Sequence, residues 1–401
     1  MLKGKTIILG VSGGIAVYKA VELLRLLTKA GANVHVVMTR SACEFVTPLT
    51  FQTLSGQPVH TELFNLYQEQ EIGHISLADR ADLFILAPAT ANLVGKIAQG
   101  LADDLLTTTV MATKAPVLVV PAMNTNMYEN PLYQRNENIL RAVGYHLLEP
   151  ICGELACGWT GQGKMPDPQD IIDAAENVLT TKDLSGCRII VSAGPTREEI
   201  DPVRYLTNYS SGRMGFAIAA AARRRGAKVT LVTGPGQLTP PAGVEVVAVV
   251  SAQQMYDAII SRFADTDVVI KAAAVADYRP VLREQQKMKK KLAEMSLELE
   301  KTPDILAELG QRKDRQFLVG FAAETEKLLE HARQKLVGKN LDMIVANDVS
   351  APGAGFDVDT NIVRFLYRDG RVEDLELMSK ADVANQLLDR IGVARHKDPA
   401  R

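Results

Sequence analysis

One pattern occurs twice in this chain of 401 residues: an apolar strand, a turn that contains glycine, an amphipathic helix, and a second strand introduced by Gly-Ala-x-Val. The first copy occupies residues 6–38, with its turn at residues 12–14, and the second occupies residues 188–233, with its turn at residues 193–195. A helix that connects two such strands makes them parallel and covers one face of their sheet. The sequence therefore predicts the α/β class, with two tandem Rossmann-like domains that are each a doubly wound parallel sheet.

A polar stretch indicates where the two domains divide. Residues 180–186 read Thr-Thr-Lys-Asp-Leu-Ser-Gly and separate the two copies of the pattern, as a linker does. Each copy is followed by a further short apolar strand, at residues 81–88 in the first half and 266–273 in the second. We therefore predict domains at residues 1–182 and 183–401. Residues 362–367 and 372–377 predict a β-hairpin around the turn at Asp369 and Gly370.

The charge balance disfavours some classes of partner. The chain has 45 lysine and arginine residues against 47 aspartate and glutamate residues, so its net charge is −2. Binding to nucleic acid or to an anionic membrane surface requires clustered positive charge, and we expect neither partner. The first apolar run is broken by glycines well before the roughly 20 residues of a membrane span. Four sparse cysteines fit a reducing compartment, so we expect a cytoplasmic protein.

The turn Ser12-Gly13-Gly14 is the first candidate for a ligand site. In open parallel sheets, ligands bind beyond the carboxyl ends of the strands, where helices begin and point backbone N–H groups at anions. A plain tight turn is the alternative interpretation. A dinucleotide site would also need an acidic residue at the end of the second strand. The sequence has Met38-Thr39-Arg40 there, and residues 232–234 in the second half have no carboxylate either, which disfavours NAD.

Four further motifs of the first half, at residues 72–76, 87–92, 121–124 and 156–165, resemble those of the flavin-containing cysteine decarboxylases. The resemblance implies a flavodoxin-like fold and bound FMN for this domain. It also implies that His74 is the catalytic base, in keeping with an unperturbed pKa of about 6.5. Asn124 would hold the substrate carboxylate, and Cys157, on a mobile clamp in that family, would donate a proton. The FMN-binding residues implied by the resemblance are Ser12, Gly13, Gly14, Ile15, Thr39, Phe45, Pro88, Thr90, Asn92 and Met123.

The motifs of the second half resemble the phosphopantothenate–cysteine ligase module. They lie at residues 192–198, 201–205, 208–216, 272–279, 287–290, 303–306, 320–324 and 346–349. The resemblance implies activation of phosphopantothenate by CTP as an acyl-cytidylate, from which cysteine then displaces CMP. Asn208 would support the first step, and Asp277 would help to hold the nucleotide and Mg²⁺ or Mn²⁺. The implied CTP-binding residues are Ala273, Asp277, Lys287, Pro303, Asp304, Ile305, Leu306, Phe321, Lys335 and Lys339.

For two features of the second half, a role in the ligase site is less certain from the residues alone: the basic run at residues 287–291 and Arg213. The basic run at residues 287–291 has the composition of an ordinary solvated loop, and only the neighbouring motifs favour a role in phosphate binding. The family usually has Ser-Ser-Gly-Lys where this chain has Ser-Ser-Gly-Arg213. Arginine keeps the charge but presents it as a planar fork, which puts a direct role for that cation in doubt.

The resemblance extends over residues 5–391, to the bacterial family that fuses the decarboxylase to the ligase. It implies the small-molecule substrates phosphopantothenate, cysteine and CTP. It also implies a homo-oligomer, in which trimers of one module and dimers of the other give a dodecamer. Two alternatives are a nicotinamide-dependent oxidoreductase and a non-catalytic, flavin-binding regulatory protein. The presence of His74, Asn124 and Cys157 together argues against the second alternative.

Overall fold

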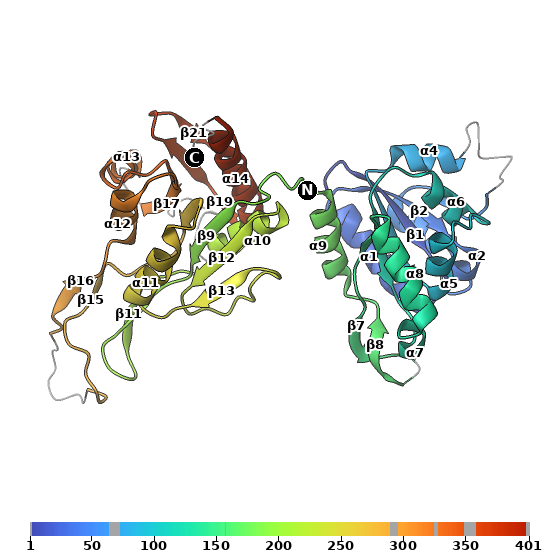
Figure 1. Ribbon diagram of the computed structural model, residues 1–401, viewed down its shortest axis with the longest axis horizontal. Coiled ribbons are helices and arrows are strands. Elements are labelled where there is room, and N and C mark those ends of the chain that lie inside the picture. Colours follow the sequence, from blue (N-terminus) through green and yellow to red (C-terminus); the bar gives the residue numbers. More distant parts are fainter. Residues whose placement is uncertain are drawn as a thin grey trace. The chain divides into compact units, whose positions relative to one another are not determined.

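The computed structural model describes residues 2–63, 73–156, 158–288, 296–324, 328–348 and 358–397. The chain divides into two compact units, Met1–Thr180 and Thr181–Arg401 (Figure 1). Each unit is built around its own sheet with helices on both faces, which confirms the predicted α/β class. Within the described ranges, no helix combines the length and the apolar character needed to cross a bilayer.

The first unit contains a six-stranded parallel sheet in the order β3-β2-β1-β4-β5-β6. If the two-residue edge strand β3 is set aside, the remaining strands follow the order 2-1-3-4-5 of flavodoxin-like sheets. The predicted flavodoxin-like, doubly wound topology is therefore confirmed. The strands are β1 (Thr6–Val11), β2 (Asn33–Met38), β3 (Val59–His60), β4 (Leu83–Ala89), β5 (Val117–Pro121) and β6 (His146–Leu147).

Alternate residues of these strands fill two cores, because successive side chains of a strand point to opposite faces. Ile7 and Leu9 pack on one face and Ile8 on the other, and all three are fully buried. The first face is covered by α1 (Val17–Lys29), α3 (Pro48–Ser55) and α9 (Pro168–Leu179). The second is covered by α4 (Gly73–Arg80), α5 (Ala91–Ala98), α6 (Leu105–Ala112) and α8 (Pro131–Ala142). Short elements complete the unit: α2 (Arg40–Cys43), α7 (Thr125–Tyr128), β7 (Ile151–Glu154) and β8 (Thr160–Lys164).

The second unit contains an eight-stranded sheet in the order β13-β12-β9-β14-β17-β18-β20-β21. Its first six strands are parallel, and its last two form the predicted hairpin, with Gly370 at φ +88° in the turn. The sheet is therefore mixed at this edge, because a short turn can join only antiparallel strands. The strands are β9 (Arg188–Ala193), β12 (Lys228–Thr233), β13 (Glu245–Ala248), β14 (Val268–Lys271), β17 (Phe317–Glu324), β18 (Met343–Asp348), β20 (Val363–Tyr367) and β21 (Val372–Asp374).

Helices again cover both faces of this sheet. One face carries α10 (Arg213–Arg224) and α14 (Lys380–Lys397), and the other carries α11 (Ala252–Phe263), α12 (Ile305–Arg312) and α13 (Leu328–Gly338). Three two-stranded ladders are added: β10 (Arg197–Glu199) with β11 (Tyr205–Thr207), β15 (Tyr278–Pro280) with β16 (Leu299–Lys301), and β19 (Thr360–Asn361) with β22 (Met378–Ser379). Figure 1 shows β15 and β16 extending away from the large sheet.

A buried ion pair joins the end of α12 to the start of β18. Lys313 Nζ lies 2.6 Å from Asp342 Oδ2, and their side chains are only 3% and 6% exposed. The same carboxylate oxygen accepts a hydrogen bond of 2.8 Å from the backbone N–H of Leu318. The carboxylate thus holds together three segments at the amino edge of the sheet. Removal of the lysine would deprive a buried carboxylate of this ion pair.

We therefore expect Lys313→Met to lower the free energy of unfolding of the second unit by about 3–5 kcal/mol. Urea unfolding at pH 7, followed by far-ultraviolet circular dichroism, measures this loss. The matched control is Lys228→Met, because Lys228 is an exposed lysine of the same unit and its substitution should change stability by no more than about 0.5 kcal/mol. Equal stability of the two variants would contradict the role given to the buried pair.

Candidate active sites

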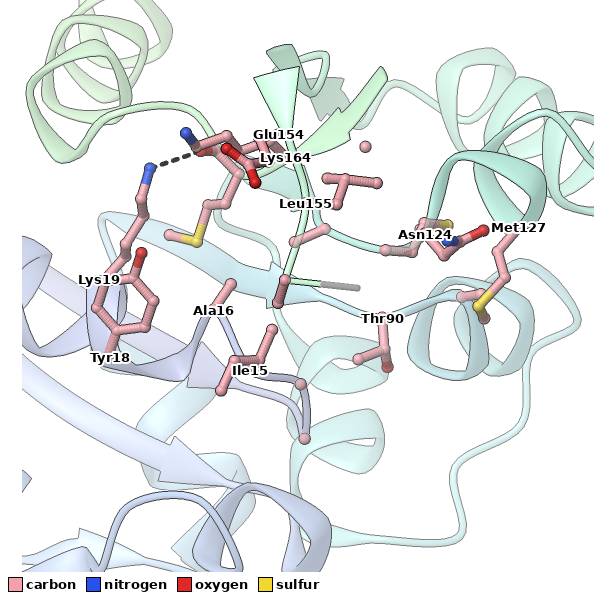
Figure 2. A pocket seen from close by; sticks show the side chains of 18 residues that line it. Ile15, Ala16, Tyr18, Lys19, Thr90, Asn124, Met127, Glu154, Leu155 and Lys164 are labelled. Carbon is pink, nitrogen blue, oxygen red and sulfur yellow. Dashed lines mark hydrogen bonds between the residues drawn. The ribbon is translucent and has the colours of Figure 1, made fainter. Parts of the chain in front are cut away.

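The first unit has a cavity where the carboxyl ends of β1, β4 and β5 meet the hairpin of β7 and β8. Its volume is about 390 Å³, and Figure 2 shows it from close by. Six of the residues predicted from the sequence line it together: Gly13, Gly14, Ile15, Thr90, Met123 and Asn124. The parallel topology accounts for this meeting, because the turns after all three strands fall on one edge of the sheet.

Ser12, in the turn after β1, forms hydrogen bonds to the turn after β4. Its side chain is buried, and its hydroxyl donates a hydrogen bond of 2.7 Å to the carbonyl of Pro88. The hydroxyl oxygen also accepts a hydrogen bond of 2.9 Å from the backbone N–H of Thr90. Thr90 in turn caps the N-terminus of α5 by accepting from the N–H of Leu93. Ser12 and Pro88 therefore position the cavity wall without lining the cavity.

Two glycines bring backbone close to backbone around the cavity. A Cβ at Gly13 would lie 2.4 Å from the Cβ of Ser41, and a Cβ at Gly163 would lie 2.3 Å from the carbonyl oxygen of Met123. Gly163 also has a φ of +147°, which other residues rarely adopt. The remaining wall is largely aliphatic, with Ile15 and Leu155 among its residues. An apolar slot with a few polar groups fits a planar aromatic cofactor such as a flavin.

Three charged residues of this cavity were not predicted from the sequence: Lys19, Glu154 and Lys164. Lys19 is buried, and its Nζ donates hydrogen bonds to the carbonyl of Met165 at 2.9 Å and to Asp167 at 3.1 Å. The first of these bonds is the dashed line in Figure 2. These contacts join residues about 146 positions apart in the chain, so no local pattern could indicate them.

The three residues expected to act on the substrate have different positions. Asn124 lines the cavity, and its side-chain oxygen accepts a hydrogen bond of 2.9 Å from the N–H of Asn126 at the start of α7. His74 lies in the first turn of α4 and does not line the cavity. Its Nδ1 is buried and has no hydrogen-bond partner in the described part of the chain. Cys157 lies outside the described residues, although its neighbours Leu155 and Ala156 line the cavity.

The other three residues of the predicted FMN set also lie outside the cavity wall. Thr39 caps α2 by accepting a hydrogen bond from the N–H of Ala42. Phe45 is 51% exposed beyond that helix. Asn92 lies in the first turn of α5, and its side chain is exposed. Thr39 and Asn92 thus follow the carboxyl ends of β2 and β4, on the same edge of the sheet as the cavity.

The second unit has two cavities at the carboxyl edge of its sheet, with volumes of about 490 and 430 Å³. Four residues line both: Lys271, Val275, Asp277 and Lys339. Every residue predicted for this site lines one or the other, except Lys287. The larger cavity has Asn208, Ala273, Asp277, Leu306, Phe321, Lys335 and Lys339, and the smaller has Asp277, Pro303, Asp304, Ile305 and Lys339.

The polar groups of this site are held in place by short contacts. Asn208 Nδ2 donates a hydrogen bond of 3.0 Å to the carbonyl of Val275. Gly212, at φ +77°, precedes the twelve-residue helix α10, whose N-terminus faces the larger cavity and suits an anion. Lys339 Nζ lies 2.8 Å from the carboxylate of Asp304. Burial would raise the pKa of Asp304, but this lysine and the N–H of Ala307 lower it overall.

Lys287 is exposed and lies away from both cavities. The chain beside it is held by Asp201 and Arg204: Asp201 accepts a hydrogen bond from the N–H of Met288, and Arg204 donates one to the carbonyl of Met288. Arg213 lines the larger cavity, where its guanidinium forms an ion pair with Asp359. Asn347, from the motif at residues 346–349, also lines that cavity, and three further polar residues there were missed by the sequence analysis: Lys271, Asn361 and Lys380.

Two protein-family models match the chain. The model described as Flavoprotein matches residues 1–180, and the model described as DNA/pantothenate metabolism flavoprotein C-terminal domain matches residues 184–394. Together with the two doubly wound units and their edge cavities, these matches define a two-domain protein of the flavoprotein class.

Two relatives are similar over nearly the whole length. The coenzyme A biosynthesis bifunctional protein CoaBC of Bacillus subtilis (strain 168) is 51% identical over 395 residues, which are 98% of this chain and 97% of that protein. CoaBC of Escherichia coli (strain K12) is 47% identical over 405 residues, covering 100% and 99%. The crystal structure of a CoaBC C-terminal domain is 47% identical and covers 54% of this chain and 100% of that one, with a TM-score of 0.48.

This chain belongs to the family of the coenzyme A biosynthesis bifunctional proteins CoaBC. That membership favours neither the nicotinamide-dependent oxidoreductase nor the non-catalytic regulatory protein considered above.

The Ser12 contacts generate a prediction about flavin retention. Ser12→Ala removes the hydroxyl that accepts from the N–H of Thr90 and donates to the carbonyl of Pro88, which keeps only a longer hydrogen bond of 3.3 Å from the backbone N–H of residue 12. The unsatisfied N–H should cost about 1–3 kcal/mol of stability in the first unit. We expect the purified variant to lose visible flavin absorbance during gel filtration. Ser55→Ala, which alters a serine at the end of α3, should keep its flavin. Full retention by Ser12→Ala would show that this serine does not shape the cavity.

Proposed function

We propose that the second unit joins 4′-phosphopantothenate to cysteine with CTP, and that the first unit decarboxylates the product to 4′-phosphopantetheine with FMN. One observation carries the proposal: each of the two sheets has cavity space at its carboxyl edge, and several of the residues expected for one of the two reactions line it. The relatives' printed name, a bifunctional protein of coenzyme A biosynthesis, supports it.

The first cavity would hold FMN against the turns after β1, β4 and β5. Gly13, Gly14 and Thr90 line its polar side, and Ile15 and Met123 provide apolar surface. Ser12 and Pro88 support the wall, and Thr39, Phe45 and Asn92 are assigned to the rim by the family resemblance. A bound flavin supplies reversible two-electron oxidation of the carbon that carries the substrate thiol, which provides an electron sink when CO₂ leaves.

In this reaction His74 would accept the proton that the substrate loses at the start. A neutral imidazole suits a base near neutral pH, and the unpartnered Nδ1 of His74 is the kind of buried polar atom that a structural role would not leave unsatisfied. Asn124, fixed by its cap of α7, would orient the substrate carboxylate. Cys157, which follows the cavity residues Leu155 and Ala156, would return a proton at the end.

In the second unit, the carboxylate of 4′-phosphopantothenate attacks the α-phosphorus of CTP and pyrophosphate leaves. The amine of cysteine then attacks the acyl carbon and CMP leaves. Asn208 supports the first step, while Lys335 and Lys339 meet the phosphates and Phe321 lines the nucleotide cavity. The family resemblance also assigns Lys287 to the phosphates, although this lysine lines neither cavity.

Asp277 is the proposed protein ligand of Mg²⁺ or Mn²⁺. It lines both cavities of the second unit. In the part of the chain that the structure describes, no group of three or more histidine, cysteine, aspartate or glutamate side chains could hold a metal ion by itself. One carboxylate completed by nucleotide phosphates and water is a usual environment for Mg²⁺ in phosphoryl-transfer sites, so the metal would arrive with CTP.

The proposal includes a cytoplasmic homo-oligomer, with the dodecamer that the family resemblance implies. Ile15, Tyr18 and Met127 support association of the first unit, because these apolar residues line its cavity and are 59%, 54% and 49% exposed. A reducing compartment suits a thiol at Cys157 that must stay free to transfer a proton.

A substitution in one unit of the full-length protein should abolish one reaction and leave the other unchanged. His74→Asn keeps a polar side chain but cannot act as a base near neutral pH. We expect it to retain flavin and to lose release of CO₂ from supplied 4′-phosphopantothenoylcysteine, while pyrophosphate release from CTP stays at the wild-type rate. Normal release of CO₂ would place the base elsewhere.

Asn208→Ala should give the opposite result. Loss of the amide should slow pyrophosphate release from CTP and 4′-phosphopantothenate by at least about tenfold, the value of one hydrogen bond made to a charged group. Decarboxylation of supplied 4′-phosphopantothenoylcysteine should continue at the wild-type rate. If this variant lost decarboxylation and kept ligation, the assignment of reactions to units would be reversed.

A further inference from the structure

Lys271 occupies an unusual position in the second unit. It is the last residue of β14, after Val268, Val269 and Ile270, which are fully buried. It lines both of the cavities at the carboxyl edge of the sheet, which share four lining residues. A lysine at the end of a buried strand would ordinarily extend into water, but this one is partly buried in the wall of a ligand site.

The ammonium of Lys271 has no hydrogen bond or ion pair with any residue that the structure describes. Other lysines around the site are compensated: Lys339 pairs with Asp304 at 2.8 Å, and Lys380 donates a hydrogen bond of 2.6 Å to the carbonyl of Val358. A desolvated ammonium without a partner is unfavourable in a folded protein. The cavity wall therefore carries at Lys271 a positive charge that a negatively charged ligand could pair with.

The charges around Lys271 indicate that this group is an anion. Burial, together with the neighbouring Lys339 and Lys335, lowers the pKa of Lys271 to about 8, against the opposing effects of Asp304 and Asp277. The net effect makes the ammonium less favourable than that of a lysine in water. An anion between these lysines and the N-terminus of α10 would reverse that effect, because it would supply negative charge and acceptor oxygens together.

We propose that Lys271 is a further substrate-binding residue of the ligase site, whose ammonium binds a phosphoryl oxygen of the cytidine nucleotide. The inference rests on the proposed ligase function. The nucleotide is favoured over the single phosphate of 4′-phosphopantothenate because Lys271, Lys335 and Lys339 together match a polyanion, and because Asp277 in the same wall would bring a metal ion that also binds nucleotide phosphates.

The test is direct binding to the full-length, flavin-loaded protein by calorimetry at pH 7. CTP, CMP, cytidine and 4′-phosphopantothenate are titrated in turn into the wild type, Lys271→Met and the control Lys228→Met. We expect Lys271→Met to bind CTP at least about tenfold more weakly, as loss of one charge-assisted hydrogen bond implies. Its affinities for cytidine and for 4′-phosphopantothenate should not change, and Lys228→Met should behave as the wild type throughout.

Urea unfolding separates a binding role from a structural one. Methionine removes an unpaired, partly buried charge, so Lys271→Met should unfold at the same or a higher urea concentration than the wild type. Lys271→Gln, which keeps a polar side chain, should share the loss of CTP affinity. Loss of affinity only together with loss of folded structure would make Lys271 a structural residue and overturn the proposal.

The remaining outcomes distinguish this inference from the function on which it rests. Undiminished CTP binding by Lys271→Met, or a loss confined to 4′-phosphopantothenate, overturns the role of Lys271 and leaves the ligase assignment standing. Failure of the wild-type protein to bind CTP overturns the ligase assignment itself, and the role of Lys271 with it.

Discussion

Parallel pairing of buried strands is the constraint on which the rest of this protein depends. Because each crossover returns the chain to the same end of the sheet, the turns that follow the strands collect at one edge. Both units then fasten this edge with a buried serine near the end of their central strand. In the first unit Ser12 accepts a hydrogen bond of 2.9 Å from the N–H of Thr90, and in the second Ser192 accepts one of 3.2 Å from the N–H of Ala273. The cavity of each unit opens beside this contact.

The two cavities differ in the chemistry of their walls, although the same topology builds them. The first is lined by aliphatic side chains and glycine backbone, and its buried lysine, Lys19, is already compensated by the carbonyl of Met165 and by Asp167. The second has Lys271 at the end of β14 and Lys335 and Lys339 from α13 and the residue after it, and Lys271 forms no ion pair within the described ranges of the chain. A planar, largely apolar cofactor suits the first wall, and a phosphate-rich substrate suits the second.

The sequence was sufficient to predict those features that local patterns determine. The strand at Thr6–Val11, the amphipathic helix that follows the turn at residues 12–14 and the hairpin around Gly370 follow from periodicity and turn composition, and the structure has them. That the hairpin extends the large sheet beside β18 depends on the order of the strands in that sheet, and no local sequence pattern reveals this order. Lys271 was missed for a similar reason. Its sequence neighbours indicate only a strand end, whereas the role proposed for it depends on its electrostatic neighbours Lys339 and Asp304, which come from distant segments.

The hairpin of β20 and β21 also affects how the protein behaves in a crowded solution. Without it, β18 would be an open sheet edge whose residues Met343–Ala346 are apolar, and such an edge can pair with a strand of another molecule. The hairpin covers this edge, and its outer strand presents Glu373 and Asp374, the latter paired with Arg364 at 2.6 Å. Charged residues on an outer strand discourage further strand addition. Resistance to aggregation therefore depends on a part of the chain that contributes no residue to either active site.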